Sequence, residues 1–128
     1  MAGTVTIAES IWSGVKKIIF DWISGVGADA GKADGVTVNP YEGEIRRILF
    51  IPDAVAVPTN LYDVRILDSD GIDVAAGNGI DLLAAAAREC FPHSALYPIS
   101  HMIAHTKLTL EVRNAGDTKK GRVVVYLR

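Results

Sequence analysis

The sequence predicts an all-β protein, a β-sandwich or jelly-roll-like domain with one short helix. Apolar and polar residues alternate over short runs, the runs end at Gly, Pro, Asn or Asp, and no repeated long helices separate them. A chain of 128 residues fits one domain, because two would each be too small to build a good core. We therefore take residues 1–128 as a single β-sandwich domain.

The N-terminal part contains two predicted strands and a long loop. Residues 4–7 form a short strand, and residues 16–23 form a second strand with its large apolar residues on one face. Residues 24–39 follow as a Gly-rich loop whose sixteen residues exceed the usual connection of about four to six. Such a loop is either a mobile tip or an interaction arm.

The middle of the chain continues the strand pattern. Residues 44–51 form a strand that ends at Pro52, because proline lacks the backbone donor of a sheet ladder. Residues 61–67 alternate, and three of them are expected to point inward: Tyr62, Val64 and Ile66. Residues 68–74 then form a turn that leads into a short strand.

Residues 81–90 form the one predicted helix. Asp81 can cap it, four successive alanines favour it, and Pro92 prevents its continuation. At the C-terminus, residues 107–113 and 122–128 form two strands joined by a polar loop, and we expect them to pair as an antiparallel hairpin.

Composition excludes several classes of function. The chain is 49% hydrophobic with a net charge of −2, so it has no basic surface for nucleic acid or an anionic membrane. Its apolar runs are far shorter than the roughly 20 residues of a membrane-spanning helix. The N-terminus lacks a secretory signal, so we expect synthesis in a cytoplasm. Cys90 is the single cysteine, which excludes an internal disulfide, and it is expected to be a buried hydrophobe.

Two groups of residues superficially indicate metal sites. Asp68, Asp70 and Asp73 resemble part of a calcium loop, but the later ligand positions of an EF-hand fail to match, and a turn explains the pattern. His101 and His105 have the spacing of a helical zinc pair, but the segment continues into a strand. Because i and i+4 lie roughly 13 Å apart on a strand, we expect no metal there.

The sequence offers little for nucleophilic catalysis. Neither Ser13 nor Ser24 lies in a G-x-S-x-G elbow, and no phosphate-binding loop occurs. A couple of Cys90 and His93 would need a fold context that three residues of separation do not supply. We therefore predict a non-enzymatic protein with no catalytic residue, no cofactor and no metal. Trp12 is the aromatic residue that a carbohydrate site would use, although aromatics on strands more simply fill a core or a subunit contact.

Residues 58–74, 108–116 and 120–126 together resemble the small β-rich virion proteins of tailed bacteriophages. The resemblance covers about residues 40–75 and 106–128 and transfers no catalytic residue. It implies a capsid decoration (cement) protein that stabilises the head, forms a homotrimer, contacts the major capsid protein and is located in the virion. Two alternatives stay open: a tail fibre, tip or adaptor, and a carbohydrate-binding module with Trp12 and the 24–39 loop at its site.

Overall fold

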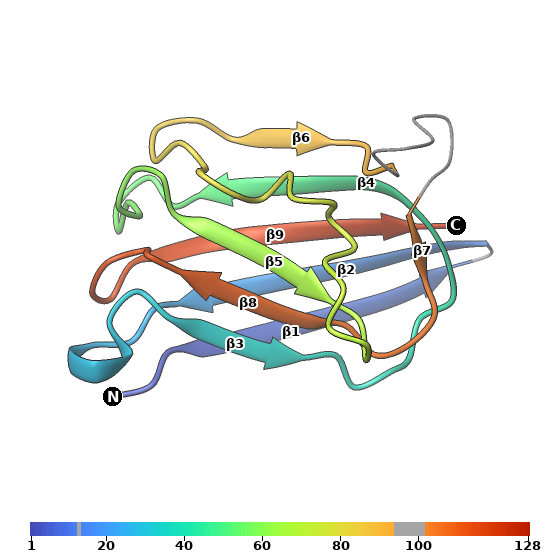
Figure 1. The fold of residues 1–128 in the computed structure, drawn as a ribbon, viewed down its shortest axis with the longest axis horizontal. Helices are drawn as coiled ribbons and strands as arrows, with labels where there is room; N and C mark the ends of the chain where they lie inside the picture. The colour runs from blue at the N-terminus through green and yellow to red at the C-terminus, as the bar shows by residue number, and fades with distance from the viewer. Residues whose placement is uncertain (13, 94–101) are drawn as a thin grey trace.

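The computed structural model describes residues 1–12, 14–93 and 102–128 and shows two antiparallel sheets packed face to face (Figure 1). The elements are β1 (Thr4–Trp12), β2 (Val15–Ile23), a 3-10 turn η1 (Gly27–Asp29), β3 (Ala33–Val36), β4 (Gly43–Pro52), β5 (Asp63–Leu67), β6 (Arg88–Cys90), β7 (Ile103–Ala104), β8 (Thr109–Arg113) and β9 (Lys120–Leu127). The larger sheet has the order β1-β2-β9-β4-β6, with β7 also paired to β4, and the smaller sheet has the order β3-β8-β5. The predicted all-β sandwich is confirmed.

The core lies between the two sheets, and the predicted alternation generates it. In β2, Ile18, Phe20 and Trp22 are all buried, while the residues between them point to the outer face. Tyr62, Val64 and Ile66 are buried on the opposite sheet, as the sequence predicted. The rings of Trp22 and Tyr62 meet across the core with their centroids 5.8 Å apart and tilted by 48°. Side chains from both layers therefore fill one continuous core.

The predicted C-terminal hairpin is wrong, although both of its strands exist. β8 pairs with β3 and β5 in the smaller sheet, and β9 pairs with β2 and β4 in the larger one. The connection crosses between the layers, and Asn114, Gly116 and Thr118 all have positive φ. Ala115 is fully buried and its backbone bonds Gly31 and Thr59, so the crossing is fixed in place. Apolar and polar residues alternate in the same way whether two successive strands pair as a hairpin or belong to different sheets. The alternation therefore does not reveal which strand each of them pairs with.

The predicted helix over residues 81–90 is also wrong. At the edge of β5 the amide of Leu82 donates to the carbonyl of Tyr62, and the carbonyl of Leu82 accepts from the amide of Leu61. Asp81 has a φ of 54°, which a helix excludes. The last three residues of the segment form β6 and pair with β4. Sheet pairing and burial of Leu82 thus override the helix propensity of the alanines.

The Gly-rich loop at 24–39 is more ordered than the sequence predicted. It contains η1 and the strand β3, which pairs with β8. The sequence concealed β3 because Gly35 occupies an inward position where a larger residue would alternate. A Cβ at Gly35 would lie 2.6 Å from the Cβ of Val5, so only glycine lets β3 approach β1 this closely.

A single carboxylate fastens β1 to the chain after β3. Glu9 accepts hydrogen bonds from the Tyr41 hydroxyl at 2.6 Å, from the amides of Val38 and Asn39 at 3.1 and 3.2 Å, and from Asn39 Nδ2 at 3.3 Å. Burial opposes ionisation of Glu9, but the hydrogen bonds outweigh it and lower the pKa of the carboxyl below its ordinary value of 4.5. The ionised form of Glu9 therefore stabilises the fold.

We expect Glu9→Gln to lower the free energy of unfolding by about 1 kcal/mol at neutral pH. Because folding depresses the Glu9 pKa, the contribution is complete above about pH 4.5 and is lost as the pH falls through the folded value. The wild type should therefore lose more stability than the variant between pH 5 and strongly acidic solution. Urea unfolding across this range measures the effect, and Glu42→Gln at an exposed position is the control. Parallel pH curves for wild type and Glu9→Gln would contradict this role.

Candidate functional site

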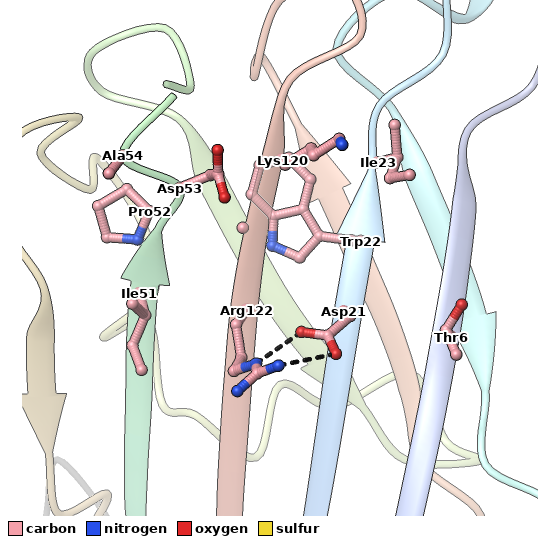
Figure 2. A pocket seen from close by; sticks show the side chains of 11 residues that line it. Thr6, Asp21, Trp22, Ile23, Ile51, Pro52, Asp53, Ala54, Lys120 and Arg122 are labelled. Atoms are coloured by element: carbon pink, nitrogen blue, oxygen red, sulfur yellow. Dashed lines mark hydrogen bonds and ion pairs between the residues drawn. The ribbon is translucent and has the colours of Figure 1, made fainter. Parts of the chain in front are cut away.

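An open groove of about 420 Å³ lies on the outer face of the larger sheet. It lies where β2, β9 and β4 run side by side, with Thr6 of β1 at one margin (Figure 2). Ile23, Ile51 and Pro52 supply apolar walls, and Asp21 and Arg122 lie between them. Asp21 and Ile23 point outward because they alternate with the buried side chains of β2. This strand was predicted at residues 16–23.

An ion pair lies at the centre of the groove. The Nε and Nη2 atoms of Arg122 donate to Oδ1 and Oδ2 of Asp21 at 2.6 and 3.1 Å, in the bidentate geometry that suits a guanidinium and a carboxylate. The hydrogen bond to Asp21 raises the pKa of Arg122 further. Both charges are thus already paired, and the groove offers hydrogen bonding beside apolar surface.

The carboxylate of Asp53 lies at the upper end of the groove and has a structural task. It accepts hydrogen bonds from the amides of Ala56 and Val55 at 2.7 and 3.0 Å, which lower its pKa. This arrangement is a turn capped by an aspartate side chain. The charged groups of Asp21, Arg122 and Asp53 are thus all held in hydrogen bonds, which suits the groove to binding contacts more than to proton transfer.

A second surface feature is the tip of the β1–β2 hairpin. Ile11, Trp12 and Val15 are 61%, 67% and 42% exposed. Trp12 pairs with Val15 across the two strands, and Ile11, the preceding residue of β1, points to the opposite face, so the three exposed apolar residues lie at one end of the hairpin. Figure 1 shows this hairpin reaching past the neighbouring strands. Exposed large apolar residues that cluster in this way are typical of protein–protein contacts.

The Asp68, Asp70 and Asp73 segment forms turns, as predicted, but the short strand expected after them is reduced to an isolated bridge between Asp73 and Leu67. Asp68 accepts hydrogen bonds from the amides of Asp70 and Ile72, and Gly71 has a φ of 78°. Asp73 accepts from the amides of Ile66, Ala75 and Gly77. These carboxylates shape the chain beside β5. Over residues 1–12, 14–93 and 102–128, no three His, Cys, Asp or Glu residues lie close enough to hold a metal ion.

The other titratable candidates are dispersed. Cys90 is buried at the end of β6, and burial raises the pKa of its thiol to about 11, so the reactive thiolate is disfavoured. His93 and His105 are exposed, and His101 lies outside the described residues. The buried Ser24 hydroxyl accepts a hydrogen bond from the Lys119 amide at 2.8 Å, so it serves the fold, and Ser13 lies outside the described residues.

The two parts of the alternative carbohydrate site, Trp12 and the 24–39 segment, approach each other only where Val38 and Asn39 bond Glu9 of β1. Trp12 is at the hairpin tip, whereas η1 and the start of the 24–39 segment lie at the other end of the sandwich (Figure 1). The groove could not be predicted from the sequence, because Asp21 and Arg122 are 101 residues apart and meet only through the β2–β9 register. Their outward positions on adjacent strands are a signal, but it appears only when the strand order is known.

These observations define the molecule as a two-sheet antiparallel β-sandwich with an open groove on one face and an apolar hairpin tip. Comparison with protein-family models, curated proteins and solved structures finds no match. No helix in the described part of the chain is long and apolar enough to cross a membrane.

Proposed function

We propose that this protein is a non-enzymatic structural subunit of a tailed-bacteriophage virion, most directly a decoration protein that stabilises the head. The observation that carries the proposal is the exposed apolar hairpin tip formed by Ile11, Trp12 and Val15 on a densely packed frame. A subunit of this kind must present apolar surface to other proteins while the rest of the chain stays rigid. The resemblance of residues 58–74, 108–116 and 120–126 to small virion proteins supports the same role.

The proposed partners are further copies of this chain and the major capsid protein. The outer face of the smaller sheet is poorly suited to an apolar contact, because Arg113 bonds Asp34 and Glu111 there and Arg65 lies 3.9 Å from Glu111. Charged residues are depleted at the centres of stable interfaces. The outer face of the larger sheet also carries ion pairs, Arg122 with Asp21 and Arg47 with Glu89, so the apolar contact is assigned to the β1–β2 hairpin. Placement in the tail is the alternative location for the same structural role.

Incorporation into particles tests the proposal. Virions whose only copy of the chain carries Ile11→Ser with Trp12→Ser should contain less of it than wild-type virions, because the variant lacks the apolar contact. Val55→Ser is the matched control, since Val55 is 93% exposed away from the hairpin. Mass spectrometry of purified particles gives the amounts. Absence of the wild-type chain, or equal incorporation of all three chains, would overturn the proposal.

A further inference from the structure

The strand β1 is the long open edge of this fold. It lies at one end of the larger sheet and has nine residues, whereas β6 at the other end has three. In the part of the chain that the structure describes, the backbone of β1 bonds only to β2. Because backbone groups alternate in direction along a strand, a row of amide and carbonyl groups on β1 points away from the sheet.

The edges of the smaller sheet differ from β1. The residues after β5 cover its open side, with hydrogen bonds from Val64 to Gly79 and from Val74 to Ile66, both 2.7 Å long. β3 at the opposite edge has only four residues. It packs Gly35 against the Val5 side chain without forming a ladder with β1. Among the described strands, β1 is thus the one long edge strand with an open side. No other described segment forms backbone hydrogen bonds along that side or covers it with its backbone.

The side chains of β1 also lack the usual protection against strand addition. It contains no proline and no lysine, and its outward residues are uncharged: Thr4, Thr6, Ala8 and Ser10. Its single charge, Glu9, is occupied by hydrogen bonds from Tyr41, Val38 and Asn39. Two copies of this strand can therefore approach each other without like charges meeting.

We propose that β1 pairs antiparallel with β1 of a second copy, so that the two larger sheets join into one continuous sheet. A full overlap of nine residues places Ala8, the middle residue, on the two-fold axis. Thr4 of one copy then lies opposite Trp12 of the other, and Val5 opposite Ile11. The exposed Ile11 and Trp12 each gain a β-branched neighbour, which is a favourable cross-strand pair.

This inference takes as its premise the self-association proposed above and names the surface that carries it. Antiparallel pairing of identical strands is two-fold, so it predicts a dimer in place of the trimer that the resemblance implies. The virion role and the pairing of β1 can be contradicted independently of each other. Virions that contain a chain of monomeric solution mass would overturn the pairing alone, and a dimer that is missing from virions would overturn the virion role alone.

Light scattering on a size-exclusion column tests the assembly. The wild type should have twice the monomer mass of 13.7 kDa. Ala8→Lys should elute as a folded monomer, because it sets two ammonium groups against each other at the axis. Val55→Lys, a charge of the same kind on a remote exposed residue, should remain a dimer. A wild-type monomer or trimer, or a dimer that persists in Ala8→Lys, would overturn the pairing.

A disulfide scan tests the register without destabilising the strand. In Ala8→Cys the two thiols face each other across the axis with Cβ atoms about 4.5–5.5 Å apart, so mild oxidation should link the copies. Thr4→Cys on the same face of the same strand is the control, since its two copies would lie roughly 27 Å apart along the ladder. Linkage of Ala8→Cys alone supports the proposal. Equal linkage of both variants, or linkage of neither, overturns it.

Discussion

Replacing Trp22 with alanine is expected to lower the free energy of unfolding by about 3–5 kcal/mol. Trp22 is 1% exposed and its ring contacts Tyr62 from the other sheet, so its removal leaves a cavity at the junction of the two layers. The neighbouring strands cannot close such a cavity, because their backbones are fixed by the β2–β9 ladder. Urea unfolding followed by circular dichroism measures the change.

The chain supplies its own control for this experiment. Trp12 is 67% exposed, so Trp12→Ala removes the same side chain from the surface and should change stability by less than about 0.5 kcal/mol. The large difference between the two tryptophans follows from burial alone. Equal losses for Trp22→Ala and Trp12→Ala would contradict the assignment of Trp22 to the core.

The second large effect is expected for Gly121→Ala in β9. Gly121 faces Trp22 across the β2–β9 ladder, and a Cβ there would lie 2.4 Å from Cζ2 and 2.6 Å from Cε2 of the indole. Trp22 is buried and packs against Tyr62, so a shift of its ring disturbs the core, and we expect a loss of about 1–3 kcal/mol from overpacking.

A double-mutant cycle separates this clash from a general effect of alanine in the strand. In the Trp22→Ala background the overlapping ring is gone, so Gly121→Ala should cost less by an interaction energy of about 0.5–3 kcal/mol. The four free energies of unfolding, measured under identical conditions, give that energy. If the losses in free energy of unfolding were purely additive, the Trp22 ring would not be the reason that a glycine is required at position 121.

The sequence was sufficient to predict the strands and their buried faces but not their partners. In β2 and β5 a large apolar residue recurs at every second position, so both the element and its inward side followed from the pattern. β8 and β9 show the same alternation, yet they belong to different sheets. Partner choice depends on how the residues between the strands are held. Here a buried Ala115, bonded to Gly31 and Thr59, directs the chain from one layer to the other.

The candidate surfaces were predictable to different degrees. The sequence singled out Trp12 as the aromatic residue that a carbohydrate site would use, and the structure shows that it is exposed at the end of β1. The groove was not predictable, because Asp21 and Arg122 become neighbours only when β2 and β9 pair. The open edge of β1 depends on strand order in the same way. The extent of a single strand and its buried face could therefore be predicted from the sequence. Features that depend on which strands are neighbours, such as the groove and the open edge, could not.

The virion role that we propose makes this β-sandwich a building block of a phage head. Quantitative mass spectrometry of heads separated from tails tests it most directly. We predict that the chain is in the head fraction, at a copy number comparable to that of the major capsid protein. Finding it only in the tail fraction would contradict decoration of the head, and absence from both fractions would contradict a virion role altogether.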